Sequence, residues 1–309
     1  MAFKHCLNAC EGVNITDSTK CKVFLASVDL GSFSKAAAAL RYTPSGVSQL
    51  VNAFEKEMGY PLLHRDKKGV TPTEEALKII PVLREILKQE EKLNQINDEI
   101  VGLATGCVTI AAYSSIATHW LPRVIRAFQE EYPQITIKLM EGIRQEVSGW
   151  LDDKIADVAF LSYKDPMLYD WIPLAEDQML AVLPKTHLLA TETTYPLQNC
   201  QYERFIMPAL GRDDDVVALF EKNNLNPNIQ FSTLENFAAM SMIEQGLGMS
   251  IMNELITRNW QCDVVKLPLD PPQQITLGIA LQSLKSASPA VKRFISYATE
   301  RLSCREVQE

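Results

Sequence analysis

Polar side chains that could read the edges of DNA bases recur at helical spacing in RYTPSGVSQLVNAFEKE, residues 41–57. Apolar residues fall on one face of that predicted helix: Val47, Leu50, Val51, Phe54 and Met58. The opposite face carries Ser45, Ser48, Gln49, Asn52 and Lys56. Gln and Asn amides pair with adenine, and Ser hydroxyls pair with several bases. This face is therefore suited to hydrogen bonding in the major groove.

A basic segment, RDKKG, follows between Leu62-Leu63 and Val70. Apolar residues on both sides of a short turn predict a hairpin whose charged tip is in solvent. The side chains at this tip that could contact phosphates are Arg65, Lys67 and Lys68. The alternative interpretation is a solvated helix followed by a surface loop, with no role in DNA binding.

Short helices with clear ends are expected to position both features. KCKVFLASVDL predicts a helix that ends at Gly31, and SFSKAAAAL predicts a second helix with Ser34 as its N-cap. Thr43 can cap the third helix with Pro44 at its first position, and Gly59 ends it. Two short helices joined by a tight turn indicate a helix-turn-helix, here followed by a basic hairpin, or wing.

Charge is distributed unevenly along the 309 residues, whose formal net charge is −8. Residues 19–72 hold eight Lys or Arg against four Asp or Glu, a balance of +4, so the rest of the chain carries −12. Phosphate attraction depends on the local patch, so an acidic chain can still bind DNA at one end. Lys35 and Arg41 add to that basic segment.

Residues 73–100 contain no cluster of turn residues and predict one long helix, with Pro81 expected to bend it near its start. A seam with alternating spacings of four and three is typical of paired helices. Its members are Ile79, Leu83, Ile86, Glu90, Leu93, Asn97 and Ile100. The alternative is an amphipathic helix that packs on its own domain. Residues 101–106, VGLATG, are expected to form a hinge.

The remaining two-thirds alternates between predicted strands and helices, which indicates a parallel sheet covered by helices. The order predicts two α/β lobes, the first from about 106–162 and 268–302 and the second from about 163–267. Ligands bind open α/β sheets beyond the carboxyl ends of the strands, here between the lobes. Ser114 and Ser115 lie between a strand and a helix start, where they could hold a carboxylate or a hydroxyl.

Several other classes of protein find little support. Seven scattered cysteines without a CxxC pair do not form a disulfide framework, and no apolar run approaches a membrane span, so we expect a cytoplasmic protein without a membrane partner. GxxxxGK[ST], GxSxG and HExxH are all absent from the sequence, so we expect no catalytic residues, no cofactor and no metal. Cys6 and Cys10 with Cys21 offer only a weak alternative metal site.

Residues 24–76 resemble the winged helix-turn-helix of LysR-type transcriptional regulators, and the similarity extends from about Thr19 to Arg301. Its landmarks are Phe24, Gly31-Ser32-Phe33, Ala36-Ala37, Leu40, Val47-Ser48, Glu55, Gly59, Leu63, Arg65 and Thr71. The resemblance implies an all-α winged helix-turn-helix with a long linker helix, then a two-lobed, periplasmic-binding-protein-like α/β effector-binding domain. The expected divisions are 1–18 as an extension, 19–72 for DNA binding, 73–105 as linker and hinge, and 106–309 for the effector.

The resemblance also implies partners and a pocket. The partners are double-stranded DNA, a small organic effector such as a carboxylate, and a second copy through the linker helix, with assembly to a tetramer. By family analogy the pocket residues beyond the two serines are Ile143, Ser162, Tyr163, Pro208 and Thr233. Pro44, Gln49, Asn52 and Asn253 depart from residues common in the family. A two-lobed solute-binding protein or an enzyme without a DNA role is the alternative.

Overall fold

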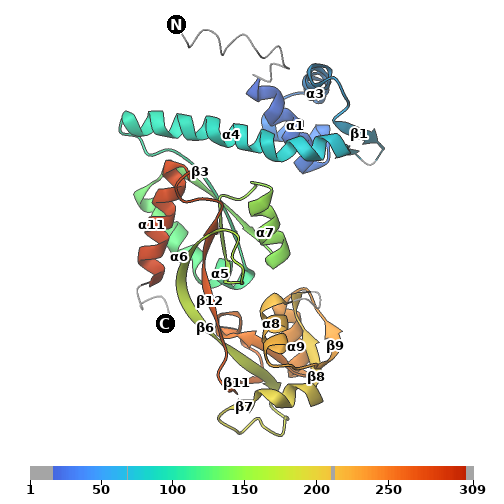
Figure 1. The fold of residues 1–309 in the computed structure, drawn as a ribbon, viewed down its shortest axis with the longest axis vertical. Coiled ribbons are helices and arrows are strands. Elements are labelled where there is room, and N and C mark those ends of the chain that lie inside the picture. The colour runs from blue at the N-terminus through green and yellow to red at the C-terminus, as the bar shows by residue number, and fades with distance from the viewer. Residues whose placement is uncertain (1–16, 68, 210–212, 304–309) are drawn as a thin grey trace. The chain divides into compact units, whose positions relative to one another are not determined.

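The structure is a computed structural model, and it describes residues 17–67, 69–209 and 213–303. The chain divides into two compact units, Met1–Asn97 and Asp98–Glu309. Unit 1 contains, in chain order, α1 (Ser18–Leu30), α2 (Phe33–Leu40), α3 (Pro44–Met58), β1 (Leu63–Asp66), β2 (Gly69–Pro72) and most of α4 (Glu74–Ile100) (Figure 1).

Capping residues set the helix ends in unit 1. Asp17 caps α1, and Gly31 ends that helix in the left-handed conformation. Ser32 caps α2 by accepting from the Lys35 N–H, so the expectation of Ser34 as the cap is wrong by two residues. Ser34 lies inside the helix because the extended backbone that a cap requires occurs at Ser32. Thr43 and Pro44 begin α3, as expected.

The core of unit 1 joins α1, α2 and α3 to the hairpin and to the first half of α4. Phe24 and Phe54 pack with ring centroids 5.8 Å apart, and Leu62 and Leu63 close the core from the start of the hairpin. From α4 the buried members are Ala76, Ile80 and Leu83. The first half of α4 therefore packs on its own unit, as the alternative interpretation of the seam proposed.

Unit 2 is built on a large curled sheet with the strand order β4-β3-β5-β12-β6-β11-β7, in which β10 also pairs with β6, and on a separate parallel pair of strands, β8 and β9. Its first elements are β3 (Gly106–Ala112), α5 (Ser114–His119), α6 (Leu121–Glu131), β4 (Ile135–Glu141), α7 (Arg144–Asp152), β5 (Val158–Ser162) and β6 (Asp170–Pro184). Its middle elements are β7 (Tyr195–Pro196), η1 (Leu197–Tyr202), β8 (Arg204–Met207), α8 (Asp214–Lys222), β9 (Asn228–Ser232) and α9 (Asn236–Glu244). The last are β10 (Ser250–Asn253), α10 (Glu254–Thr257), β11 (Val264–Asp270), β12 (Gln274–Leu281) and α11 (Pro289–Ser303).

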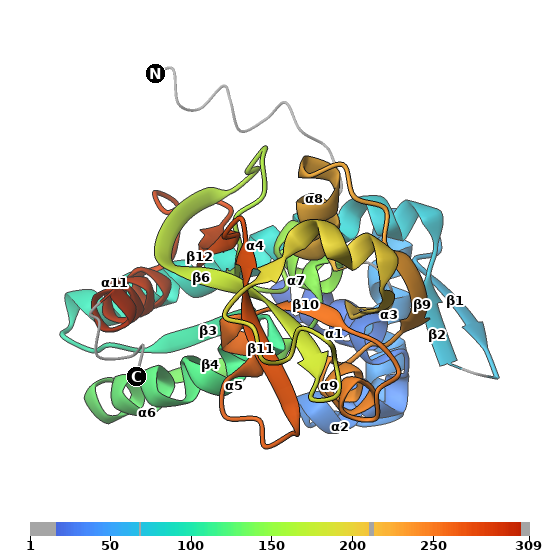
Figure 2. The same ribbon diagram turned by 90° about the horizontal axis from the view of Figure 1, so that it is seen from below.

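The expected parallel sheet is only partly correct. β3 pairs in parallel with β4 and β5, whereas β12, β10 and β11 run antiparallel to β6, and β12 also runs antiparallel to β5. The antiparallel pairs arise because the chain crosses between the lobes through β6 and returns through β12. Figures 1 and 2 both show β6 passing from one lobe into the other beside β12.

Each lobe has helices on both faces of its strands. In the lobe that holds β3, β4 and β5, α5, α6 and α11 pack on one face around Phe128 and Phe294, and α7 covers the other. In the second lobe α8 packs against Phe205, and α9 packs against Ile206 on the opposite side. The two lobe cores divide within β6, because Ile172 and Leu174 pack with the first core and Met179 with the second.

Candidate functional sites

Helix α3 presents two chemically distinct faces. Val47, Val51 and Phe54 are buried in the core of unit 1. The polar residues predicted to read DNA lie on the other side, with Ser45, Gln49, Asn52 and Lys56 exposed and Ser48 half-buried. The Thr43 hydroxyl accepts from the Gly46 N–H at 3.1 Å and fixes the start of the helix. A rigid helix with amide and hydroxyl groups on its solvent face can be inserted into a major groove.

The wing formed by β1 and β2 is fixed by contact with the turn after α1. The Val70 N–H donates to the Gly31 carbonyl at 3.0 Å. Gly69 has a φ of +139°, and a Cβ at this position would lie 2.2 Å from the Gly31 oxygen. Only glycine therefore permits this approach. The hairpin is held against the helix-turn-helix rather than left as a free loop.

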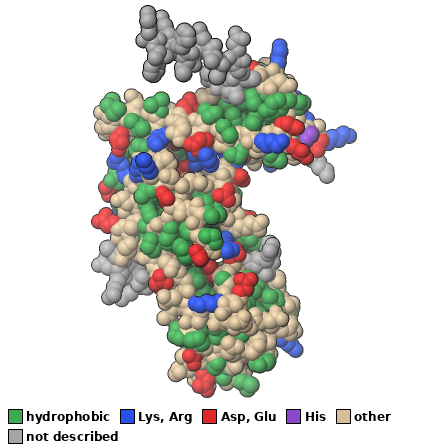
Figure 3. Space-filling view, viewed as in Figure 1, with side chains coloured by type: hydrophobic (Ala, Val, Ile, Leu, Met, Phe, Trp, Pro, Cys, Tyr) green, Lys and Arg blue, Asp and Glu red, His purple; other side chains and the backbone are tan. Residues whose placement is uncertain are grey.

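The predicted phosphate contacts differ in how available their charges are. Lys35, Arg41 and Lys67 are exposed, and Figure 3 shows basic side chains over the wing, with acidic ones beside them. Lys68 lies outside the described residues. Arg65 is different, because its guanidinium contacts the Glu55 carboxylate at 2.6 Å and lies 5.4 Å from the centre of the Phe33 ring.

Glu55 has a structural role that the sequence analysis recorded only as a landmark of the family. Its Oε1 accepts from the N–H groups of Leu62 and Leu63 at 2.8 and 3.0 Å, while its Oε2 pairs with Arg65. One carboxylate on α3 thus holds the first strand of the wing. The signal in the sequence was an acidic residue seven positions before a hairpin, which is too common to assign a role.

A cavity of about 280 Å³ lies between the two lobes of unit 2. Of the predicted effector residues, Ser114, Ser115 and Ile143 line it. The two serines belong to α5, and Ile143 is the N-cap residue of α7. The second lobe contributes residues from the start of α8 and α9 and from the β10–α10 junction: Asp213, Asp214, Asp215, Leu234, Glu235, Asn236, Asn253 and Ile256.

The other four predicted effector residues do not line this cavity. Ser162 is fully buried at the end of β5, and Pro208 is buried after β8. Tyr163 is 45% exposed and its ring packs edge-on against Trp171. The Thr233 N–H donates to the Met207 carbonyl at 3.0 Å, so this residue connects backbone segments of the second lobe. The cavity does lie near the ends of the strands, as predicted. Which side chains there point into it depends on packing.

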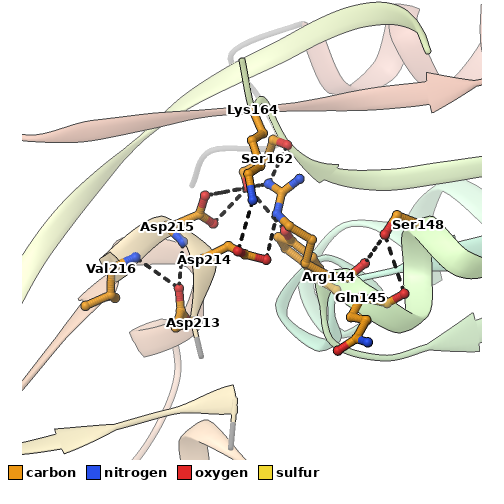
Figure 4. Close-up of polar contacts among 10 residues, drawn as sticks. Arg144, Gln145, Ser148, Ser162, Lys164, Asp213, Asp214, Asp215 and Val216 are labelled. Atoms are coloured by element: carbon orange, nitrogen blue, oxygen red, sulfur yellow. Dashed lines mark hydrogen bonds and ion pairs between the residues drawn. The ribbon is translucent and has the colours of Figure 1, made fainter. Parts of the chain in front are cut away.

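Arg144, at the start of α7, links the two lobes (Figure 4). Its guanidinium donates to the Ser162 carbonyl at 2.7 Å and also contacts the Ser162 hydroxyl. It lies 3.6 Å from the Asp214 carboxylate and 3.7 Å from that of Asp215. The Ser162 hydroxyl lies 2.7 and 2.8 Å from the two carboxylate oxygens of Asp215. Ser162 is therefore a bridge between the lobes rather than part of the cavity wall.

The carboxylates around Arg144 are perturbed by burial. Burial and the neighbouring Asp215 charge raise the pKa of Asp213 to about 6. Burial also raises the pKa of Asp215, although Arg144 and the Ser162 hydroxyl act in the opposite direction. Burial raises the pKa of Tyr113, whose hydroxyl lies 3.2 Å from that of Ser162. A cleft in which two carboxylates share one guanidinium beside a third carboxyl of raised pKa is a candidate for ligand recognition.

Sequence reasoning missed Arg144 and the three consecutive aspartates, Asp213–Asp215. A triple aspartate at a predicted helix start was a visible signal, but helix capping explained it without a ligand. Asp213 does cap α8, accepting from the N–H groups of Asp215 and Val216, each at 3.1 Å. The position of Arg144 across the cleft depends on the pairing of β3, β4 and β5, which no local pattern in the sequence indicates.

A second, larger cavity of about 660 Å³ shares Ile143, Arg144, Ala209 and Asp214 with the first. Its other lining is mostly apolar and comes largely from the segment before β6, including Pro166, Met167, Leu168 and Tyr169. The Arg144–Asp214 pair therefore lines both the acidic cavity and the more apolar one.

No cluster of three or more His, Cys, Asp or Glu side chains with the arrangement of a metal site occurs in the described part of the chain. Cys6 and Cys10, named above as a weak alternative, lie outside the described residues. Across residues 17–67, 69–209 and 213–303, no helix is long and apolar enough to span a membrane.

Comparison with known proteins gives matches along most of the chain. A family model described as bacterial regulatory helix-turn-helix protein, lysR family, matches residues 19–77, and one described as LysR substrate binding domain matches residues 102–303. A Bacillus subtilis protein, uncharacterized HTH-type transcriptional regulator YvbU, is 32% identical over 285 residues, which cover 91% of this chain and 97% of that protein.

Solved structures share the fold. Full-length CbnR in complex with its target DNA has a TM-score of 0.63 at 18% identity, covering 93% of this chain and 99% of that one. The effector binding domain of QuiR in complex with shikimate has a TM-score of 0.58 at 21% identity, covering 64% of this chain and 97% of that one. At these identities the similarity is one of fold.

Proposed function

Since the chain belongs to the LysR family of transcriptional regulators, we propose that it recognises DNA through the exposed face of α3 and the tip of its wing. The observation that supports this most strongly is the separation of the two faces of α3, with the buried face in the core and amides and hydroxyls in solvent. Gln49 and Asn52 would read base edges, and Lys35, Arg41, Lys56 and Lys67 would contact phosphates. Arg65 would mainly hold the wing.

The small-molecule effector would occupy the cavity between the lobes of unit 2. Ser114, Ser115 and Ile143 would contact it from one lobe, and residues at the starts of α8 and α9 from the other. A ligand that binds one lobe arrangement better than another shifts the population toward that arrangement. QuiR, which shares the fold, was solved with shikimate, an example of a small organic ligand in such a domain.

The regulator would act in the cytoplasm, without catalysis of its own, and as a homo-oligomer paired through α4. Support for pairing comes from the second half of that helix, where Leu93 is 66% exposed and Ile100 is 78% exposed. Covering apolar side chains at this spacing with a second helix removes them from water and stabilises the pair.

The DNA-binding proposal is tested by selecting duplexes from a random pool and measuring affinity by fluorescence anisotropy. Gln49→Ala with Asn52→Ala should reduce the preference for selected over random DNA by about 1–3 kcal/mol per lost bidentate contact. Lys222→Ala, which removes an exposed charge from α8 in the other unit, is the matched control and should change nothing. Unchanged discrimination in the α3 variant would remove α3 from base recognition.

A further inference from the structure

The interlobe cavity has an unbalanced charge. Six carboxylates line it: Glu141, Glu146, Asp213, Asp214, Asp215 and Glu235. Arg144 is the only Lys or Arg among the described lining residues. Like charges in a partly enclosed space repel more strongly than in water, because the dielectric constant is lower there. Among the described lining residues, negative charge therefore exceeds positive charge.

The charge of Arg144 is already engaged by the protein. Its terminal nitrogen donates to Ser162 and lies near Asp215, and its Nε, which has no hydrogen-bond partner among the described residues, is 3.6 Å from Asp214 Oδ2. Lys164, which lines the second cavity, pairs with Asp214 at 3.1 Å. The carboxylate of Asp215 thus occupies the position beside Arg144 and Ser162 where an anionic ligand would otherwise be expected to bind.

What the cavity offers a ligand is hydrogen-bond acceptors. Both hydrogen bonds accepted by Asp213 end on Oδ1, so Oδ2 has no such partner among the described residues. The buried Oδ1 of Asn236 also lacks a hydrogen bond within the described part of the chain. For the buried Asn236 oxygen the missing donor costs free energy, which a ligand bearing N–H groups would recover. Both the net charge and the unmatched acceptors are complementary to a positively charged group that carries N–H donors.

We propose, resting on the proposed role of this cavity as the effector site, that the regulator senses a small organic amine whose ammonium group binds between Asp213, Glu235 and Asn236. The ammonium would supply positive charge and N–H donors to acceptors that lack them. A volume of about 280 Å³ lies near the lower end of the range for ligand pockets, about 300–1,000 Å³, so the ligand is small. Asp215 acts as a specificity residue, because it holds Arg144 and excludes carboxylates.

The protonation behaviour of the cavity agrees with this geometry. Burial and the Asp215 charge raise the pKa of Asp213, with Asp214 acting in the same direction. The N–H groups of Val216 and Asp215 oppose that shift without removing it. A cation beside Asp213 would favour its charged form, so binding of an amine should strengthen as the pH rises through the range where Asp213 ionises.

The test uses the full-length protein and three ligands of similar shape: benzylamine, benzyl alcohol and benzoate. Isothermal titration at pH 7.5 should give at least ten-fold tighter binding for benzylamine than for the other two. Asp213→Asn retains a capping side chain on α8, and Glu235→Gln changes an exposed residue, so both variants should fold. Each should weaken benzylamine binding about five-fold or more. Glu221→Gln, on α8 but outside the cavity lining, should leave it unchanged.

Each outcome bears on the inference. Tighter binding of benzoate, equal binding of all three ligands, or no measurable binding of benzylamine would overturn the amine class. Benzylamine binding that is unaffected by both cavity variants would also overturn it. DNA affinity of the same preparations separates this inference from the wider proposal. Intact DNA binding with no preference for the amine rejects only the ligand class, whereas loss of DNA binding in the wild type rejects the proposed function.

Discussion

Two opposing effects act on the Asp213 carboxylate. Capping of α8 favours its charged form, whereas burial and the neighbouring charges of Asp214 and Asp215 disfavour that form. Its pKa in the folded protein, about 6, is above the ordinary value of 3.8, so the folded state binds the proton more tightly. The free energy of unfolding should therefore fall as the pH rises from about 4 to about 6. One such proton gives a slope of up to about 1.4 kcal/mol per pH unit.

Replacing Asp213 with Asn should remove that slope, because Asn keeps a capping oxygen but does not titrate. All four tryptophans, Trp120, Trp150, Trp171 and Trp260, belong to unit 2, so their fluorescence during urea unfolding reports on this unit alone. The wild-type and variant stabilities should converge near pH 4 and separate toward pH 7.5, with the variant favoured. A difference independent of pH would mean that the capping contact, not the charge, is responsible.

Two basic residues of the wing are expected to behave differently on mutation. Lys67→Ala should leave stability unchanged and reduce the slope of log affinity for DNA against log salt by about 0.9, the loss of one phosphate contact. Arg65→Ala should instead lower stability by roughly 0.5–1 kcal/mol, since the Glu55 pair is partly screened by solvent. Anisotropy titrations in salt and thermal unfolding distinguish the two. Equal effects of both variants on the salt slope would place Arg65 on the phosphates as well.

At the scale of the element, α4 has two parts with different surroundings. In its first half Leu83 is 2% exposed and belongs to the core of unit 1, and just past the middle of the helix Glu90 is held by Ser18 and Lys22 from α1. In its second half Leu93 and Ile100 are exposed. The seam inferred from spacing therefore mixes core positions with positions available for pairing, because both kinds are apolar at the same helical spacing.

Variants in the two halves of α4 should separate folding from assembly. Leu93→Asp with Ile100→Asp should lower the molar mass measured by light scattering, because charges at a paired seam are desolvated without partners, and should leave unit 1 folded. Leu83→Ala should keep the wild-type mass and destabilise unit 1 by about 2–5 kcal/mol. Circular dichroism detects the unfolding of unit 1, which contains no tryptophan. An unchanged mass for the double variant would reject pairing through the second half of α4.

At the scale of the whole molecule, the described residues connect the lobes of unit 2 through the covalent crossings, through Leu255 of α10, which packs in the core of the first lobe, and through a polar cluster around Arg144. Arg144 and Asp215 are both largely buried, with side chains 13% and 18% exposed, and they come from different lobes. Ser162 hydrogen-bonds to both. Because an effector in the adjacent cavity would contact residues of both lobes, we expect this cluster to contribute to the free energy of closing the cleft before any ligand binds.

A double-mutant cycle should measure that contribution. Arg144→Gln and Asp215→Asn should each destabilise unit 2, and the cycle should give a coupling energy of about 1–3 kcal/mol for residues in one network. Urea unfolding followed by tryptophan fluorescence supplies the four free energies. Additive effects would show that the two charges act independently and that this pair does not couple the lobes.

The sequence alone determined the identity and order of most elements in this protein. The caps Thr43 and Gly59, the two faces of α3 and the alternation of strands and helices are local signals, because they depend on residues within a few positions of one another. The family resemblance added the winged helix-turn-helix and the two-lobed domain. The mixed direction of the sheet was not predicted, since a strand that returns to pair with a distant one carries no local mark of its direction.

Only the tertiary structure decided which side chains meet. Glu55 and Arg65 are ten residues apart in sequence, while Arg144 and Asp215 are separated by about a third of the length of unit 2, and each pair forms through folding. The family resemblance predicts Ser162 as a pocket residue, yet its side chain forms part of the link between the lobes. Leu83 was read as a pairing residue, yet it is in the core. Periodicity reports that a residue is apolar on one face of a helix, and only packing determines what covers that face.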